Sequence, residues 1–252
     1  MLKLNDVCVS YGYGDVVKNI SFEINNNLSV IGPNGCGKTT LLKAVANILK
    51  YRGGIEIDGK PVNKMKNREL SSKVAMMSQT SGIYFSYSVF DTVMMGRYVH
   101  MRNGLLTMPS KEDKNAVLNC LSALNLLDEK DREITALSGG QLQRVFLART
   151  IVQEPKIILL DEPTNHLDLK YQIELIEYLR GWSSQDGRMV VGVLHDINLA
   201  IKLSDTLMIM KEGEIAAFGK TGEIIGRELL REVYGIDVAG YMQNTFKLWE
   251  NL

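Results

Sequence analysis

The chain is short of cysteines, of net charge and of long apolar runs, and each shortage excludes a class of protein. Its three cysteines, Cys8, Cys36 and Cys120, are odd in number and lack the spacing of a metal site, so we expect free thiols in the cytosol. The formal net charge is +0 at pH 7, and without a basic field we expect no nucleic-acid partner. No apolar run approaches the roughly 18 residues of a membrane span, and residues 1–6 do not resemble a secretory signal.

The composition is otherwise that of a globular chain. Apolar residues make up 45% of the 252 positions, an ordinary share for a soluble protein. The length permits one large α/β domain or two small ones, and either can bury a substantial core.

A glycine-rich stretch is the most specific feature, and it reads Gly32-Pro33-Asn34-Gly35-Cys36-Gly37-Lys38-Thr39-Thr40. It lies between the apolar run Leu28–Ile31 and the helical pattern Leu41–Leu49. Glycines let backbone N–H groups converge on an anion without Cβ clashes, and the helix N-terminus adds partial positive charge. Lys38 can then reach the β- and γ-phosphates, and the Thr39 hydroxyl can bind Mg²⁺. A simple glycine-rich turn is disfavoured by the strand and helix on its two sides. The Cys36 thiol is either reactive there or an inert filler.

A second helix start follows in the middle of the chain. Leu137-Ser138-Gly139-Gly140-Gln141 precedes the helical stretch Leu142–Val152. Ser138 with two glycines opens a helix N-terminus that is able to hold an anion.

Polar side chains also follow two buried strands. Ile157–Leu160 runs into Asp161-Glu162-Pro163, and neighbouring strand residues point to opposite faces. One carboxylate can therefore hold a metal through water while the other faces an attacking water. The alternative, a solvated acidic loop, is disfavoured by the apolar run before the two carboxylates and by the proline directly after them. The strand Met189–Leu194 ends on His195, at the edge where open α/β sheets bind ligands, and Asp196 can cap the helix after it.

Two other features have competing interpretations. Tyr11 lies between the strands predicted over Leu2–Val9 and Val16–Ile24, where it either stacks on an adenine ring or is an ordinary loop tyrosine. Segment 80–108 is rich in methionine and aromatic residues, which form either a core or an exposed docking surface. A helix is predicted after it, with Ser110 as N-cap and Asp113 at its third position.

In this order the motifs resemble those of the ATP-binding-cassette (ABC) ATPases over nearly the whole chain. The residues that carry the resemblance are Gly32–Thr39 (Walker A), Gln79 (Q-loop), Leu137–Gln141 (signature), Ile157–Glu162 (Walker B), Asn165–Asp168 (D-loop) and His195 (switch histidine). The resemblance implies an α/β fold with a P-loop NTPase core, namely a mixed sheet flanked by helices, an N-terminal antiparallel β subdomain and an inserted helical subdomain. The expected parts of this single domain are residues 1–80 and 156–220 for the core and β subdomain, about 81–155 for the helical subdomain, and 221–252 for a short C-terminal extension.

The resemblance also implies roles in binding and hydrolysing ATP with Mg²⁺. Glu162 would be the general base, and His195 and Gln79 would assist catalysis. Mg²⁺ would be held by Thr39 and Gln79, and by Asp161 through water. The residues expected to bind ATP are Tyr11, Gly32, Pro33, Asn34, Gly35, Cys36, Gly37, Lys38, Thr39 and Thr40, and, across a head-to-tail dimer, Ser138, Gly139, Gly140, Gln141 and Asp168.

Within the family, the chain is similar to the importer ATPases for ferric siderophores, haem and cobalamin. The stretches Val93–His100, Leu167–Gln172 and Leu194–Ala200 carry this similarity, with departures at Val99, where proline is usual, and at Asn26-Asn27. It implies a homodimer on the cytoplasmic face of the membrane, a permease that docks near residues 80–100, and an external solute-binding protein acting indirectly. Export or uptake of another solute, a soluble ABC ATPase acting on DNA or ribosomes, and a nucleotide-binding module without turnover are the alternatives.

Overall fold

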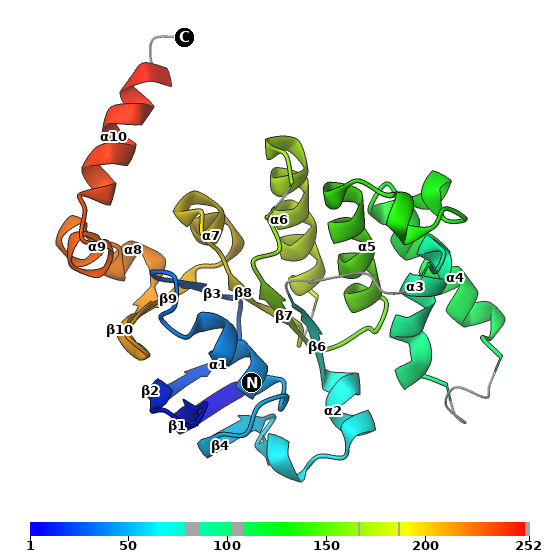
Figure 1. The fold of residues 1–252 in the computed structure, drawn as a ribbon, viewed down its shortest axis with the longest axis horizontal. Coiled ribbons are helices and arrows are strands. Elements are labelled where there is room, and N and C mark those ends of the chain that lie inside the picture. The colour runs from blue at the N-terminus through cyan, green and yellow to red at the C-terminus, as the bar shows by residue number, and fades with distance from the viewer. Residues whose placement is uncertain (79–85, 102–107, 166, 186, 250–252) are drawn as a thin grey trace. The chain divides into compact units, whose positions relative to one another are not determined.

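The computed structural model describes residues 1–78, 86–101, 108–165, 167–185 and 187–249 (Figure 1). The chain forms two compact units, one made of Met1–Gly59 with Val193–Leu252 and the other of Lys60–Gly192. We call them unit 1 and unit 2. Gln79 and residues 80–85, which include part of the expected docking segment, lie outside the described residues.

Unit 1 begins with an antiparallel sheet of strand order β2-β1-β4. Its strands are β1 (Leu2–Ser10), β2 (Asp15–Ile24) and β4 (Arg52–Ile57). Leu2 pairs with Ile24 on one side and with Ile57 on the other, and all three side chains are buried. The alternation of buried and exposed residues along β2 places one face of this sheet on a core.

A mixed set of strands completes unit 1. β3 (Leu28–Ile31) is parallel to β9 (Thr206–Lys211), and β9 is antiparallel to β10 (Glu214–Lys220). All four side chains of β3 are buried, and the Ser29 hydroxyl donates to the Ala200 carbonyl oxygen of α7 (Ile197–Leu203) at 2.8 Å. As predicted, Asp196 caps α7, accepting from the N–H groups of Asn198 and Leu199 at 2.7 and 3.2 Å.

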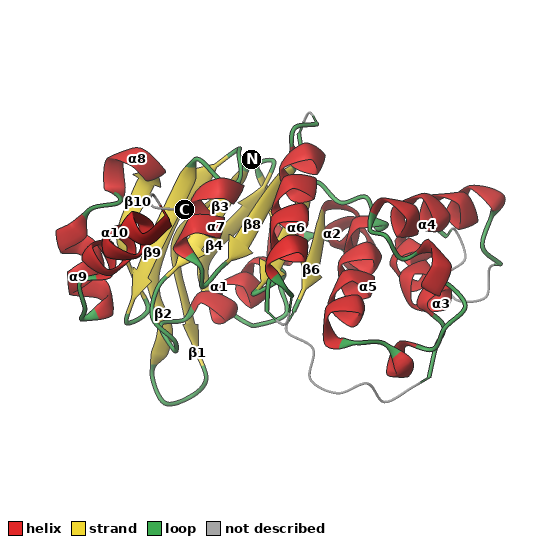
Figure 2. Ribbon diagram, turned by 90° about the horizontal axis from the view of Figure 1, so that it is seen from above, coloured by secondary structure: helices red, strands yellow, loops and turns green. Residues whose placement is uncertain are grey.

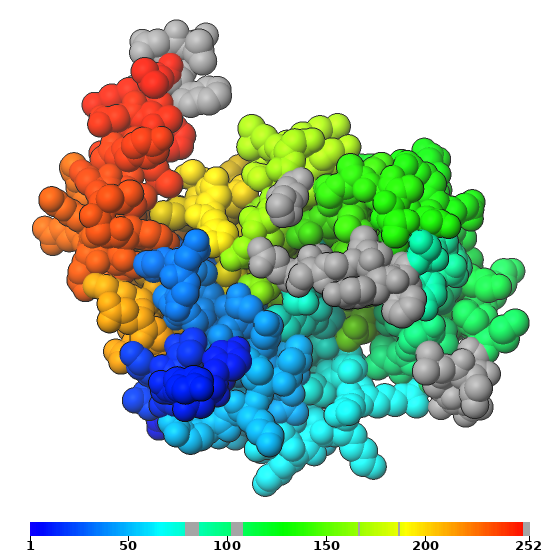
Figure 3. All heavy atoms as spheres, in the orientation of Figure 1, coloured from blue at the N-terminus to red at the C-terminus, as the bar shows by residue number. Residues whose placement is uncertain are grey.

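The C-terminal part of unit 1 is helical. The sequence shows two helical patterns after residue 220, and the structure has three helices there, α8 (Thr221–Ile224), α9 (Arg227–Tyr234) and α10 (Val238–Trp249). An Arg227–Asp237 ion pair joins α9 to the start of α10, and Gly235 ends α9 in the left-handed conformation at φ 74°. α10 stands out from the rest of this unit (Figure 3).

In unit 2, the strands β8, β7 and β6 lie side by side in that order. They are β6 (Val74–Met77), which is parallel to β7 (Ile157–Asp161), and β8 (Met189–Val193). Every side chain of β7 and β8 is buried, as the continuous apolar runs predict for strands covered on both faces. The unit opens with β5 (Lys60–Pro61), the 3₁₀ turn η1 (Val62–Lys64) and α2 (Asn67–Lys73), and α6 (Leu169–Ser183) connects β7 to β8.

The remaining helices of unit 2 pack on one another (Figure 2). They are α3 (Val89–Met94), η2 (Met95–Val99), α4 (Lys111–Ala123), η4 (Leu127–Glu129), η5 (Ile134–Ala136) and α5 (Gly139–Ile151). The predicted cap of α4 is present, because the Ser110 hydroxyl accepts from the Asp113 N–H at 3.1 Å while the Asp113 carboxylate accepts from the Ser110 N–H at 3.1 Å. The α/β fold class, with an antiparallel sheet and a mixed sheet flanked by helices, is as predicted.

A buried ion pair links three parts of this helical group. The Arg97 side chain of η2, 9% exposed, donates from Nε to Asp113 Oδ1 at 2.9 Å and from Nη1 to the Val152 carbonyl oxygen at 2.9 Å. Burial raises the pKa of the Asp113 carboxyl, but hydrogen bonds from Ser110 and Arg97 outweigh it, so this pKa lies below its ordinary value of 3.8. The folded state therefore favours the ionised carboxylate.

Replacing Arg97 with Met should lower the free energy of unfolding by about 3 kcal/mol at neutral pH, because it leaves the Asp113 carboxylate buried without its cation. The wild-type advantage is present above the ordinary pKa of Asp113 and is lost as the pH falls through the lower folded-state pKa, so urea denaturation below pH 3.8 should show a smaller difference. Arg52→Met, which removes an exposed arginine paired with Asp15 at 2.6 Å, should change little. Equal losses in both variants would contradict this account.

Candidate active site

The glycine-rich loop of unit 1 has a backbone that only glycine adopts without strain. Gly32, Gly35 and Gly37 have φ angles of 149°, 79° and 101°. The loop is also tightly packed, since a Cβ atom on Gly32 would lie 2.2 Å from the Met210 carbonyl oxygen, and one on Gly37 would lie 2.8 Å from that of Val16. These contacts fix the path of the backbone that leads into α1 (Lys38–Val45), where we expect the N–H groups to bind an anion.

The Lys38 side chain is held inside this loop. It is 6% exposed, and its ammonium group donates to the Gly32 and Pro33 carbonyl oxygens at 2.7 and 2.8 Å. The positive charge is therefore fixed beside the N-terminus of α1, where it adds to the helix dipole.

Two other predicted residues of unit 1 lie near the loop. The Tyr11 hydroxyl is 3.4 Å from the Thr40 Oγ1 of α1, and the residue is 56% exposed. His195 is exposed and follows Leu194, whose N–H donates to the Val30 carbonyl oxygen of β3 at 3.2 Å. Since β3 leads into the loop, this bond places His195 at the same end of the strand.

The C-terminal helices also reach this loop, which the sequence did not indicate. Burial raises the pKa of Tyr234 to about 12, the nearby Cys36 thiol adds to the rise, and a backbone hydrogen bond from Gly32 opposes it. Lys211 ties β9 to the same helix, donating to the Glu232 carbonyl oxygen at 3.2 Å. No local pattern around Tyr234 could have shown this, because the contact spans two hundred residues of sequence.

In unit 2 the two predicted carboxylates differ in environment. Asp161 ends β7 and is 3% exposed, whereas Glu162 is half-buried and has a left-handed φ of 56°. Asn165 donates from Nδ2 to Glu162 Oε2 at 2.6 Å, so it fixes the orientation of the Glu162 carboxylate. The sequence pattern indicates Asn165 only as part of the D-loop motif and gives it no role of its own. The separate environments agree with separate tasks.

The signature stretch opens α5 as predicted. The Ser138 hydroxyl accepts from the Gln141 N–H at 3.3 Å, and the Ser138 N–H donates to Gln141 Oε1 at 3.0 Å. Ser138 and Gly139 are exposed, so this helix end is open to another molecule. Asp168 is exposed as well, and it caps α6 by accepting from the Tyr171 N–H at 3.1 Å.

Comparison with known proteins identifies the family. The family model described as "ABC transporter" matches residues 17–165. The chain belongs to the ABC transporter family. It is an ATPase, the ATP-binding subunit of an ABC transporter.

The relatives of this ABC ATPase match over most of their length. It is 40% identical to the uncharacterized ABC transporter ATP-binding protein MJ0089 of Methanocaldococcus jannaschii, over 97% of this chain and 94% of that protein. It is 37% identical to the "Probable siderophore transport system ATP-binding protein YusV" of Bacillus subtilis, over 94% of this chain and 87% of that protein.

Solved structures with the same fold include a transporter and a dimer. One is described as the inward-facing conformation of a metal-chelate type ABC transporter, with a TM-score of 0.79 and 30% identity, covering 94% of this chain and 89% of that one. Another is the dimeric ATP-binding cassette MJ0796 bound to ADP and Pi, with a TM-score of 0.79 and 30% identity, covering 87% of this chain and 98% of that one. Among the described residues of this ABC ATPase, no helix is long and apolar enough to cross a membrane.

Replacing Lys38 with Ala should abolish ATP binding, because it removes the cation fixed beside the phosphate-binding loop. Titration with a fluorescent ATP analogue should show at least a roughly 100-fold weaker dissociation constant. Lys43→Ala, which removes a lysine from the last turn of the same helix, is the matched control and should bind as the wild type does. Undiminished affinity in Lys38→Ala would contradict the assignment of the loop.

Proposed function

We propose that this chain hydrolyses ATP as a head-to-tail dimer that drives uptake of a metal chelate, such as a ferric siderophore, haem or cobalamin, through a separate permease. The observation that carries the proposal is that one chain has two helices, α1 and α5, that begin at glycine-rich turns, and that the start of α5 at Ser138 and Gly139 is exposed. A single ATP has one γ-phosphate, so a twofold arrangement gives each end a task.

The dimer is supported by the exposure of the signature end. Ser138 and Gly139 are exposed, and Asp168 is exposed in the same unit. These residues would meet the nucleotide held by the partner's loop. MJ0796, whose cassette is similar to this chain, is dimeric with ADP and Pi bound.

The chemistry proposed for the site is attack of water on the γ-phosphorus. Glu162 would orient and deprotonate the water, with its carboxylate aligned by Asn165 at 2.6 Å. His195 and Lys38 would stabilise charge that develops on the phosphate oxygens. Tyr11 would stack on adenine. The proposal thus gives the reaction one proton acceptor and two cationic or hydrogen-bonding partners.

Mg²⁺ fits the oxygen donors expected to hold it. Asp161 is a buried carboxylate at the end of β7, and Thr39 supplies a hydroxyl at the start of α1. Hard oxygen donors of this kind, together with phosphate oxygens, are what Mg²⁺ prefers. Bound there, the ion would neutralise charge on the phosphates, and Gln79 is the third proposed ligand.

The permease would dock near residues 80–100. The described part of that segment lines a groove on the surface of unit 2. A groove of about 410 Å³ lies between α2 and η2, with Arg68, Tyr98 and Val99 on its walls. The Arg68 side chain donates to the Val99 and Met101 carbonyl oxygens at 3.1 and 3.0 Å, which fixes the groove's shape. Tyr98 is 41% exposed and could pack on a partner.

The metal-chelate class rests on two similarities. YusV is named for siderophore transport, and the similar transporter structure is described as metal-chelate type. The subunit would then act at the cytoplasmic face of the membrane, and a solute-binding protein outside would deliver the chelate to the permease.

Replacing Glu162 with Gln should lower the ATP hydrolysis rate by about 100-fold or more while ATP still binds, because the amide cannot accept the proton of water. The variant should remain a dimer in ATP, as measured by light scattering. Glu177→Gln, an exposed change on α6, is the matched control. A Glu162→Gln chain that hydrolyses ATP at the wild-type rate would remove this residue from its role.

Capture of the tagged chain from its native membranes should recover a many-helix permease of the metal-chelate type. The Tyr98→Asp variant should no longer recover that permease but should still bind ATP, because the substitution puts a charge in the docking groove. Tyr241→Asp, at a 75% exposed position of α10, is the control. An exporter-type partner, ribosomes or DNA in place of the permease would overturn the importer assignment and leave the ATPase standing.

A further inference from the structure

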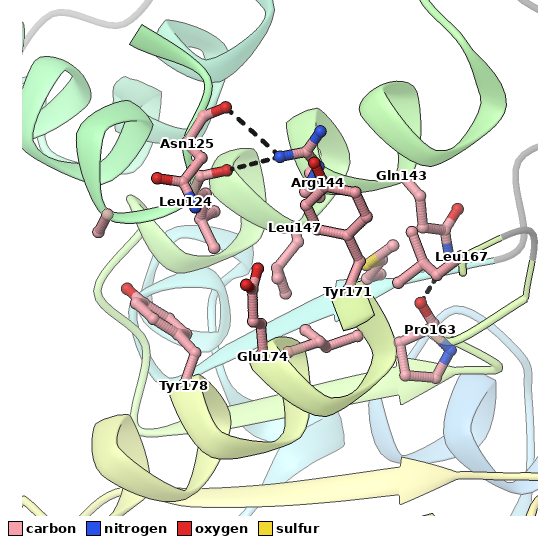
Figure 4. A pocket seen from close by; sticks show the side chains of 13 residues that line it. Leu124, Asn125, Gln143, Arg144, Leu147, Pro163, Leu167, Tyr171, Glu174 and Tyr178 are labelled. Carbon is pink, nitrogen blue, oxygen red and sulfur yellow. Dashed lines mark hydrogen bonds between the residues drawn. The ribbon is translucent and has the colours of Figure 1, made fainter. Parts of the chain in front are cut away.

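The signature helix of unit 2 contacts the segment that follows the catalytic carboxylate. In the turn after the signature, Gln143 of α5 donates from Nε2 to the Pro163 carbonyl oxygen at 3.2 Å. Pro163 is the residue directly after Glu162. Figure 4 shows the Gln143 side chain reaching to the Pro163 carbonyl oxygen through this bond. One helix therefore carries both the signature and a contact beside Glu162.

Arg144, the next residue of α5, contacts the helix that begins at Asp168. Its guanidinium lies over the Tyr171 ring of α6, 4.2 Å from the centroid (Figure 4). Its Nη1 donates to the Leu124 and Asn125 carbonyl oxygens at 3.1 and 3.4 Å, at the C-terminal end of α4. Arg144 thus joins three helices at one point.

The segment between Glu162 and α6 is held at several places. Asp168 accepts from the Tyr171 N–H, and Gln172 donates to the Thr164 and Leu167 carbonyl oxygens at 3.3 and 3.0 Å. Asn165 of the same segment orients Glu162. A displacement of α5 must therefore move this segment, break these hydrogen bonds or open the packing around them.

Opening the packing between α5 and this segment would separate buried apolar side chains. The cavity that these side chains enclose has a volume of about 40 Å³, and its walls include the buried side chains of Leu124, Leu147 and Leu167. Buried side chains in contact with one another transmit a displacement from one helix to the next.

Arg144 is also an unfavourable choice for packing alone. Its Nε is buried without a hydrogen-bond partner among the residues that the structure describes, and an unsatisfied buried donor costs about 1–3 kcal/mol. An aliphatic residue could cover the Tyr171 ring without this cost. The choice of arginine at this position is explained if Arg144 serves to join α4, α5 and α6.

We infer that Gln143 and Arg144 are positioning residues that couple the signature of a subunit to its own Glu162. The inference rests on the proposed head-to-tail dimer, in which the signature contacts the partner's ATP while Glu162 acts on the ATP of its own subunit. Closure of the signature on one nucleotide then places the base for the other. The network makes hydrolysis at the two sites cooperative.

The test compares variants of the full chain in ATP titrations of hydrolysis. Arg144→Met and Tyr171→Leu should each lower kcat about 5- to 10-fold and bring the Hill coefficient from its wild-type value above 1 to about 1. The dissociation constant of a fluorescent ATP analogue for the isolated subunit should stay within about twofold, because the phosphate-binding loop lies in unit 1. Gln143→Glu, which cannot donate to the Pro163 carbonyl, should act in the same direction.

Conservative and matched variants separate coupling from general damage. Tyr171→Phe keeps the ring and should retain cooperativity, and the double variant of Arg144→Met with Tyr171→Leu should be no worse than either alone. Arg149→Met is the control, because Arg149 lies on the same helix and stacks on Phe146 of that helix, 4.9 Å from the ring centroid. It should leave the Hill coefficient unchanged.

The outcomes also separate this inference from the proposed function. A wild-type chain that neither dimerises in ATP nor hydrolyses it cooperatively would overturn the dimer and, with it, the coupling. Wild-type cooperativity that survives in Arg144→Met, Tyr171→Leu and Gln143→Glu would overturn the coupling alone. Loss of cooperativity in Arg149→Met as well, with a parallel fall in melting temperature, would show general destabilisation and overturn it too.

Discussion

The close approach of backbone to backbone around the glycine-rich loop is the constraint on which unit 1 depends. Gly32 lies against the Met210 carbonyl of β9, and Gly37 lies against the Val16 carbonyl of β2. The turn between β9 and β10 completes the enclosure, because the Gly213 N–H donates to the Cys36 carbonyl oxygen at 3.1 Å. Backbone N–H groups can converge on a phosphate only if this path is kept, so both sheets of unit 1 serve to hold it.

The sequence predicted those parts of the site in which the chemistry is local. The cap of Ser110 with Asp113 joins residues three positions apart, so their types and spacing are sufficient, and Ser138 with two glycines likewise indicated the start of α5. The buried strands that end at Asp161 and beside His195 were equally clear, because an apolar run that stops at a polar residue requires no knowledge of distant neighbours.

Contacts between distant residues could not be predicted in this way. The Arg97–Asp113 pair and the position of Tyr234 beside Gly32 depend on how the elements pack, and neither shows in a local pattern. Element ends were missed for a related reason. The helix after the glycine-rich loop was predicted to reach Leu49, but it ends at Val45, because Asn47 adopts the left-handed conformation at φ 56°.

The contacts around Glu162 share a property that suits a coupling element. Gln143 and Gln172 donate to the main-chain carbonyl oxygens of Pro163 and Leu167, so they hold the path of the backbone after Glu162. A backbone path held from two helices moves with those helices, whereas a side chain held alone can change rotamer without moving the backbone. Asn165 belongs to that backbone segment, and its hydrogen bond to the Glu162 carboxylate makes the orientation of the carboxylate depend on the position of the segment. If Glu162 is the base, as we propose, its alignment would depend on the helix packing of unit 2, of which the signature helix is a part.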